Sequence, residues 1–152
     1  MNLYAIPPLI TNIAIFCIGF FVYFKKKHSK TSITFSLFCL SLTVWLFGYT
    51  GMYLSKNLTH ALMWARIGFM GITFIPVLAY HFIITLLDLR QKRIIIFLYL
   101  TTIPSLILAW TNYVYNGIAT YFWGYYPTAG SLYFIFLGMF AILFSYTISK
   151  KV

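Results

Sequence analysis

The stretch FVYFKKKHSK, residues 21–30, decides the fold, because a cluster of lysines directly follows a long apolar run. Two more basic clusters follow, RQKR at residues 90–93 and KK at residues 150–151. The apolar stretches between them are long enough to cross a bilayer, for which a helix needs about 20 residues. Basic residues concentrate in the cytoplasmic loops of membrane proteins. The spacing therefore predicts a polytopic membrane protein with all three clusters on the cytoplasmic side.

Composition agrees with a membrane protein. The chain is 62% hydrophobic and only 8% charged, whereas a soluble domain is about 25% charged. The net charge of +10 could suggest a nucleic-acid partner, but the basic residues flank apolar runs and form no continuous face. Next to an anionic leaflet each lysine or arginine gains about 1 kcal/mol. The lipid bilayer is therefore the expected partner, and nucleic acid is not.

The fold class predicted from these runs is all-α: a transmembrane helical bundle of about five helices in one domain, residues 1–152. No lysine or arginine precedes the first apolar run, which argues against a cleavable signal peptide and favours an N-out anchor. Five crossings then place the C-terminus inside, in the plasma membrane, and residues 111–130 form an external loop that touches the interface. The expected spans are 8–24, 33–54, 61–87, 94–110 and 132–148.

Small residues mark where helices should approach closely. Ala61, Ala65, Gly68 and Ile72 fall on one face of the third expected span. In lipid, such small-residue faces let helix backbones come into contact. We expect this stripe to pack against a neighbouring helix, and Pro76 further along the same span to kink the helix or loosen its hydrogen bonding.

Catalysis is poorly supported by the residues present. Asp88 is the one acidic residue, and its place four residues before Lys92 favours a local interfacial ion pair. His81 is the one histidine inside a span and is expected to hydrogen-bond a neighbouring helix. Cys17 and Cys39 have no CxxC partner or nearby histidine pair, so neither a disulfide nor a metal site is expected. The chain is therefore not expected to be an enzyme or to hold a cofactor.

Arg66 is harder to explain by packing alone. It lies about 8 Å inside the third span at 1.5 Å per residue, and Asp88 is about 33 Å further along a straight helix. The only carboxylate of the chain therefore cannot reach it. Arg66 must snorkel to the outer phosphates, bind carbonyl groups or aromatic faces, pair with a partner chain, or contact an anionic ligand. Snorkelling is the simplest of these alternatives.

Aromatic residues gather near the expected outer interface, where tryptophan and tyrosine are enriched. They form either an aromatic belt or a shallow outward-facing pocket with Arg66 as its cation. The residues are Trp64, Trp110, Tyr113, Tyr115, Tyr121, Trp123, Tyr125 and Tyr126.

Two stretches carry a resemblance to a known family. The run ALMWARIG at residues 61–68, with Pro76 beyond it, resembles the third helix of the seven-helix N-terminal sensor region of bacterial histidine kinases. The run WGYYPTAGSLY at residues 123–133 resembles the segment before the fifth helix of that family. The resemblance implies a membrane-embedded input domain that detects an external or membrane-dissolved signal. Such a domain passes a conformational change to a cytoplasmic kinase or cyclase transmitter.

The chain departs from this family in having five expected spans instead of seven and no kinase region. We therefore expect a non-catalytic sensory input module whose output domain is absent from this chain. A second copy of the chain, forming a homodimer, is a further expected partner. A small accessory or scaffold subunit of a membrane complex, or part of a transporter, is the alternative. The candidate ligand-binding residues are Trp64, Arg66, Trp123 and Tyr125.

Overall fold

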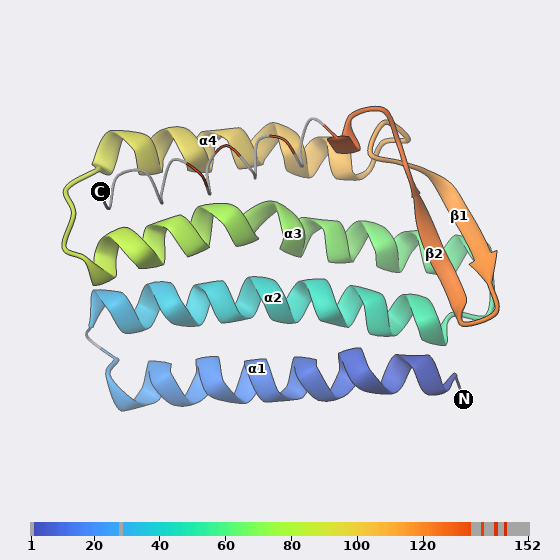
Figure 1. Ribbon diagram of the computed structural model, residues 1–152, viewed down its shortest axis with the longest axis horizontal. Coiled ribbons are helices and arrows are strands. Elements are labelled where there is room, and N and C mark those ends of the chain that lie inside the picture. Colours follow the sequence, from blue (N-terminus) through green and yellow to red (C-terminus); the bar gives the residue numbers. More distant parts are fainter. Residues whose placement is uncertain (1, 28, 135–137, 139–141, 143–144, 146–152) are drawn as a thin grey trace.

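Four long helices lie side by side in chain order in the computed structural model (Figure 1). The structure describes residues 2–27, 29–134, 138, 142 and 145. Each helix packs against the next along the chain. After a short 3-10 turn at Leu3–Ala5, the helices are α1 (Ile6–Lys25), α2 (Lys30–Leu54), α3 (Leu58–Leu86) and α4 (Lys92–Ala109).

All four helices are long enough and apolar enough to cross a membrane. Each begins two or three residues before the corresponding expected span, because polar residues such as Lys30 and Lys92 enter the first turn. Pro7 and Pro8 lie in the first turn of α1, where proline costs no hydrogen bond. The expected fifth span, 132–148, lies mostly outside the described residues, as do the terminal lysines 150–151.

The two ends of the helix layer differ in charge. Among the described residues, seven of the nine lysines and arginines lie at one end, which we call the basic end, and all seven are exposed. They surround the α1–α2 turn and the α3–α4 turn. The opposite end, which we call the hairpin end, holds the N-terminus and the α2–α3 turn (Figure 1). The seven are Lys25, Lys26, Lys27, Lys30, Arg90, Lys92 and Arg93.

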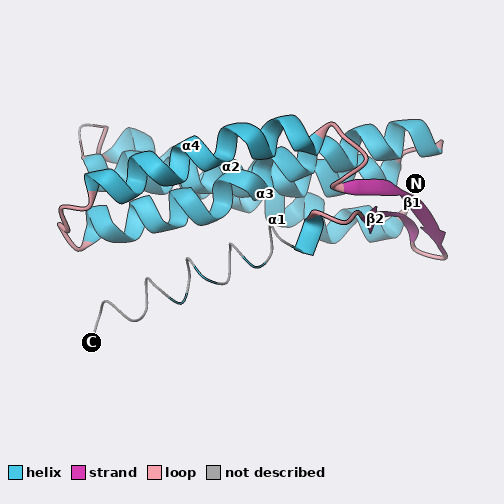
Figure 2. Ribbon diagram, turned by 90° about the horizontal axis from the view of Figure 1, so that it is seen from above, coloured by secondary structure: helices cyan, strands magenta, loops and turns pink. Residues whose placement is uncertain are grey.

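The all-α prediction is wrong at the hairpin end, where a β-hairpin follows α4. Strands β1 (Tyr115–Tyr121) and β2 (Gly124–Ala129) pair antiparallel. Phe122 and Trp123 form a two-residue loop. Gly124, the residue after the loop, has a φ of 134°, which favours glycine. Aromatic and β-branched residues suit a pleated strand better than an irregular loop. The hairpin lies across the ends of α2 and α3 and contacts both (Figures 1 and 2).

Helices α2 and α3 meet backbone to backbone. A Cβ atom on Gly48 would come within 2.4 Å of the Cα of Gly68, and one on Gly71 would come within 2.6 Å of the Ser41 carbonyl oxygen. The predicted stripe is therefore an interhelical contact: Gly68 and Ala65 are buried, as is Ala61, while Ile72 is half-buried. Glycine at these positions allows the two backbones to pack in lipid without intervening side chains.

Helices α1 and α2 use a similar contact nearer the basic end, about six residues from Lys25 and from Lys30. A Cβ atom on Gly19 would approach the Cβ of Cys39 to 2.6 Å. The Ser36 hydroxyl reaches across the same contact, 2.8 Å from the Gly19 carbonyl oxygen and 2.8 Å from that of Ser32. One serine thus bridges two helices while bonding its own backbone, an arrangement common between membrane helices.

The contact between α3 and α4 depends on side chains instead. His81 Nδ1 and the Tyr99 hydroxyl lie 3.0 Å apart, which bears out the expected packing role of the histidine. Nearer the basic end, the Tyr80 hydroxyl donates to Gln91 Oε1. A small buried cluster of Val77, Tyr80, Ile84 and Leu98 fills the space between the helices.

Asp88 ends α3 through its backbone. Its φ of 51° lies in the left-handed region, where aspartate is tolerated better than most residues. Its N–H donates to the Thr85 carbonyl at 3.4 Å and the N–H of Leu89 donates to the Ile84 carbonyl at 2.9 Å, the two bonds of a Schellman motif. For these two described residues, the structure shows no ion pair between Asp88 and Lys92, which the sequence predicted. Asp88 lies in the turn that ends α3, and its carboxylate is exposed there.

Candidate functional site at the hairpin end

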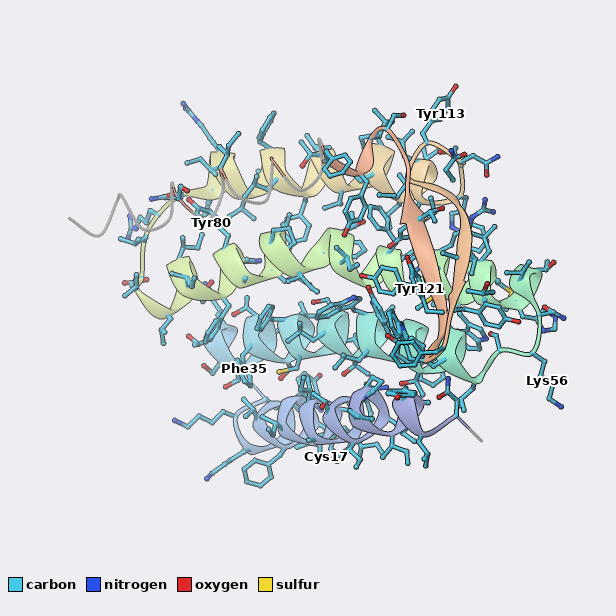
Figure 3. The ribbon with its side chains drawn as sticks, turned by 45° about the vertical axis from the view of Figure 1, so that its right-hand side comes forward. Cys17, Phe35, Lys56, Tyr80, Tyr113 and Tyr121 are labelled. Atoms are coloured by element: carbon cyan, nitrogen blue, oxygen red, sulfur yellow. The ribbon has the colours of Figure 1, made fainter. Side chains whose placement is uncertain are left out.

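The turn between α2 and α3 is held at both of its ends by side-chain hydrogen bonds. Asn57 caps α3, and its Oδ1 accepts from the backbone N–H of His60 at 2.9 Å. Asparagine is favoured there because its side chain satisfies an N–H that the helix leaves unpaired. On the other side, the Ser55 hydroxyl donates to the Gly51 carbonyl at 2.8 Å. Lys56 lies between them, with its side chain extending away from the helices (Figure 3).

Trp64 lies in the second turn of α3 and packs against α2. A Cβ atom on Gly51 would come within 2.3 Å of indole carbon Cδ2, so the ring occupies the space that a larger residue would fill. Phe47 meets the same ring edge-on, with centroids 5.3 Å apart and an interplanar angle of 86°. The position of the indole is therefore set by two residues of α2.

A pocket of about 460 Å³ opens beside the indole of Trp64. Its apolar walls come from α1, α2 and α3, and its polar rim comes from the α2–α3 turn. Pockets of about 300–1,000 Å³ that combine apolar walls with a few polar groups are typical of small-molecule sites. The lining residues are Leu9, Phe47, Thr50, Gly51, Leu54, Ser55, Lys56, Asn57, His60 and Trp64.

Arg66 lies on another side of α3, because residues two apart on a helix differ by about 200° in direction. Its Nη2 donates to Asn112 Oδ1 at 3.1 Å. Its Nε is buried and has no hydrogen-bond partner among the described residues. Arg66 therefore joins α3 to the segment after α4, and it does not line the pocket beside Trp64.

The other two candidate residues lie on the hairpin. Trp123 stacks on Tyr121 with centroids 4.6 Å apart and nearly parallel rings, and its carbonyl accepts from Asn2 Nδ2 at 2.7 Å. The Tyr125 hydroxyl donates to the Lys56 carbonyl in a long hydrogen bond of 3.4 Å. The same Asn2 Nδ2 donates to the Tyr53 carbonyl at 3.1 Å, so the hairpin is tied to the N-terminal segment, to α2 and to the α2–α3 turn.

Tyr115 anchors the hairpin in the bundle. Its ring is buried and meets Phe69 of α3 edge-on at 5.5 Å, and Tyr133 lies 6.2 Å away on its other side. Burial raises the pKa of the Tyr115 phenol well above its usual value, and the nearby Tyr133 and Tyr126 phenols raise it further. The Tyr115 phenol is therefore neutral at physiological pH, and its role here is packing.

The four candidate residues share the hairpin end but do not form one pocket. Trp64 forms a wall of the pocket and Tyr125 contacts its rim through Lys56, whereas Arg66 and Trp123 lie outside it. Sequence reasoning missed Leu9, Lys56 and His60 as pocket residues. Leu9 belongs to α1 and comes close only through helix packing, whereas the run of polar residues at 55–57 is a local signal that could have marked the rim.

The residues that could bind a metal ion are dispersed. The described residues contain no group of three or more histidines, cysteines or acidic residues that could hold a metal ion.

A second pocket of about 390 Å³ lies between α2 and α3, and Tyr99 of α4 also lines it. Its walls are almost entirely apolar and include the side chains of Leu37, Leu40, Phe74 and Leu78. Such walls suit lipid chains and expose almost no polar surface that could orient a ligand.

The sequence matches the model of a family described as the N-terminal 7TM region of histidine kinase over residues 7–149. No curated protein and no solved structure matches the chain. The family match confirms the resemblance seen at residues 61–68 and 123–133. With four apolar helices, it identifies a multi-pass membrane protein of a sensor family whose defining region is distinct from the kinase catalytic domain. The chain belongs to this family.

Proposed function

We propose that this chain is the membrane-embedded, non-catalytic input module of a signal-transduction receptor. It detects a signal at the hairpin end and passes a conformational change to a cytoplasmic kinase or cyclase transmitter at the basic end. The observation that carries the proposal is the family match over residues 7–149. The separation of the pocket and hairpin from the basic end supports it, because input and output then lie at opposite ends of the same helices (Figure 1).

The proposed topology has five crossings, N-out and C-in, in the plasma membrane. Its support is the charge difference between the two ends, since lysine and arginine near the ends of membrane helices set orientation. Lys56 and Arg66 are the two cations of the described residues that lie at the hairpin end. With residues 132–148 as the fifth crossing, the terminal lysines 150–151 join the other basic clusters inside.

The hairpin offers a route from the signal end to the last crossing. Gly130 N–H donates to the Val114 carbonyl at 2.7 Å, and Leu132 N–H donates to the Tyr113 carbonyl at 3.0 Å. The start of the segment that leads to the fifth expected span is thus bonded to the two residues that directly precede β1. Tyr125 bonds the same hairpin to the α2–α3 turn. We propose Trp64, Arg66, Trp123 and Tyr125 as residues that contact or relay the signal.

The test joins the chain in frame to a histidine-kinase transmitter and measures autophosphorylation in membrane vesicles. Tyr125→Phe removes the hydroxyl that reaches Lys56 and keeps the ring, so it is expected to shift the basal kinase activity. Tyr121→Phe is the matched control, because Tyr121 keeps its stacking on Trp123 without the hydroxyl. Arg66→Gln, which removes the guanidinium facing Asn112, is expected to shift kinase activity as well.

A fusion whose kinase activity is the same for wild type, Tyr125→Phe and Arg66→Gln, at equal expression, contradicts the sensor proposal. Equal changes in Tyr125→Phe and Tyr121→Phe contradict the proposed route through Lys56 and leave the input role in place.

A further inference from the structure

We infer that the pocket beside Trp64 binds a small anionic amphiphile, with one apolar chain or ring and one carboxylate or phosphate head, that partitions into the bilayer. The inference deepens the proposed function by naming the class of signal, and it rests on that function only for the claim that binding is signalled. Three features of the pocket support it: exposed apolar walls, an unbalanced cation on the rim, and a hydrogen bond from the rim to the hairpin.

The walls expose apolar side chains that a ligand could cover. Leu9 of α1 is 38% exposed, Phe47 of α2 is 49% exposed and Leu54 is 47% exposed, and all three line the pocket with Trp64. These residues lie near the ends of three helices that can each cross a membrane. At that depth, amphiphiles place the junction between head group and chain, so the walls suit the apolar part of such a molecule.

The rim carries positive charge without an opposing carboxylate. Lys56 is exposed there, beside the hydroxyl of Ser55, the amide of Asn57 and the ring of His60. Asp88, the single acidic residue of the chain, lies at the other end of α3, about 42 Å from His60 at 1.5 Å per residue. A lysine with no carboxylate in reach favours an anionic head group, to which the Asn57 amide N–H groups can also donate.

The rim is also the part of the pocket that contacts the hairpin. The Lys56 carbonyl accepts from the Tyr125 hydroxyl, so a head group that draws Lys56 toward the pocket displaces the atom to which the hairpin is bonded. The pocket size, about 460 Å³, fits one small ligand. We infer that the occupant is a free amphiphile dissolved in the bilayer and not one of the lipids that form the bilayer.

The experiment uses the full chain in nanodiscs of zwitterionic phosphatidylcholine and a photoactivatable long-chain carboxylate as the probe. Labelled peptides are identified by mass spectrometry. Labelling is expected to concentrate on the pocket residues of α1, the α2–α3 turn and the start of α3. The unlabelled carboxylate should compete, whereas an alcohol or a quaternary ammonium amphiphile of equal chain length should compete poorly.

Two matched pairs of variants locate the site. Leu9→Trp fills the pocket from α1, whereas Ile10→Trp adds the same ring at an exposed neighbouring position outside the lining. Only the first should abolish labelling at the pocket. Lys56→Gln should weaken binding about fivefold, as expected for the loss of one exposed charge interaction, and Lys26→Gln at the basic end should leave binding unchanged. Both lysines are exposed, so these variants keep the fold.

Labelling spread evenly over lipid-facing positions, equal competition by the alcohol, or full displacement by nanodiscs of phosphatidylglycerol alone would overturn the inference. Pocket binding that leaves the kinase activity of the fusion unchanged contradicts the sensor function and keeps the site. Kinase activity that responds to Tyr125→Phe without any labelling of the pocket contradicts the site and keeps the sensor function.

Discussion

The α2–α3 contact in the hairpin half and the α3–α4 contact in the basic half are held together by different means. In the hairpin half, α2 and α3 meet through Gly48 and Gly68, and the hairpin packs across them through Tyr115. In the basic half, α3 and α4 are joined by side-chain hydrogen bonds such as His81–Tyr99 around a smaller buried cluster. Backbone contacts through glycine leave no room for adjustment, whereas side-chain contacts can exchange partners and rotamers.

This difference indicates how the two halves would share a signalling task. Under the proposed function, the closely packed hairpin half would move as one unit when a ligand binds at its rim, because packed interfaces transmit displacement instead of absorbing it. The basic half can respond by repacking α4 against α3.

The largest effect is expected from Gly48→Ala. The added Cβ would lie 2.4 Å from the Cα of Gly68, so α2 and α3 must separate, at a cost of about 1–3 kcal/mol. Gly68→Ala should cost less, because its Cβ would meet its nearest neighbour, the Trp45 carbonyl oxygen, at 3.3 Å. Thermal unfolding in detergent, followed by tryptophan fluorescence, measures both. Ile107→Ala on the exposed face of α4 is the control, and equal losses in all three would refute the backbone contact.

At the basic end, Asp88→Val should destabilise the protein by about 1–3 kcal/mol, the usual cost of strain at a left-handed residue. Asp88→Gly and Asp88→Asn should be tolerated, because both residues adopt the φ of 51° readily. The same unfolding assay ranks the three variants. A loss in Asp88→Asn as large as that in Asp88→Val would show that the carboxylate itself matters.

Arg66 and Asn112 should show a moderate coupling in a double-mutant cycle. Their hydrogen bond of 3.1 Å is expected to contribute about 0.5–1.5 kcal/mol. Arg66→Met keeps the apolar stem, and Asn112→Ala removes the acceptor. A coupling of zero would mean that Arg66 merely snorkels, in which case Arg66→Lys would serve equally well.

The smallest effect is expected from Tyr99→Phe. Hydrogen bonds between membrane helices are worth about 0.6 kcal/mol on average, so loss of the bond to His81 should barely change stability. A loss in this variant that equals the loss in Gly48→Ala would remove the contrast between the two halves.

The helices could be predicted because the sequence features that mark where they begin and end are local. Apolar runs flanked by Lys25–Lys27 and by Arg90–Arg93 define where α1 ends and where α4 begins. The stripe of Ala65 and Gly68 could also be read from helical periodicity. Its partners, Gly48 and Trp45, could not be assigned, because which helix faces the stripe depends on the packing of the whole layer.

The hairpin was missed although its residues carried a signal. Tyrosine, isoleucine and threonine in Tyr115–Tyr121 favour a strand, and two residues separate it from Gly124–Ala129. The loop pair Phe122-Trp123 lacks the Asn-Gly or Asp-Gly signature of a tight turn, and Pro127 is a residue that is rare inside strands. Proline is acceptable in a two-stranded hairpin, where one side of each strand needs no partner.

The shared position of the candidate residues could be predicted, but the residues of the pocket could not. Trp64 and Tyr125 lie at the same end of the helices, as the preference of tryptophan and tyrosine for the interface led us to expect. The pocket itself combines Leu9 with residues about fifty positions later in the chain. Only the packing of α1 against α2 brings these residues together, and no local pattern in the sequence encodes it.

The sidedness of the two ends in intact cells decides whether the pocket and hairpin face outward. Single cysteines replace Lys56, Asn116 or Lys27 in a Cys17→Ser, Cys39→Ser background, and a membrane-impermeant maleimide is applied. We expect Lys56→Cys and Asn116→Cys to react in intact cells, and Lys27→Cys to react only after the membrane is opened. Labelling of Lys27→Cys in intact cells, with protection of Asn116→Cys, would place the pocket and hairpin inside and contradict an outward-facing sensor.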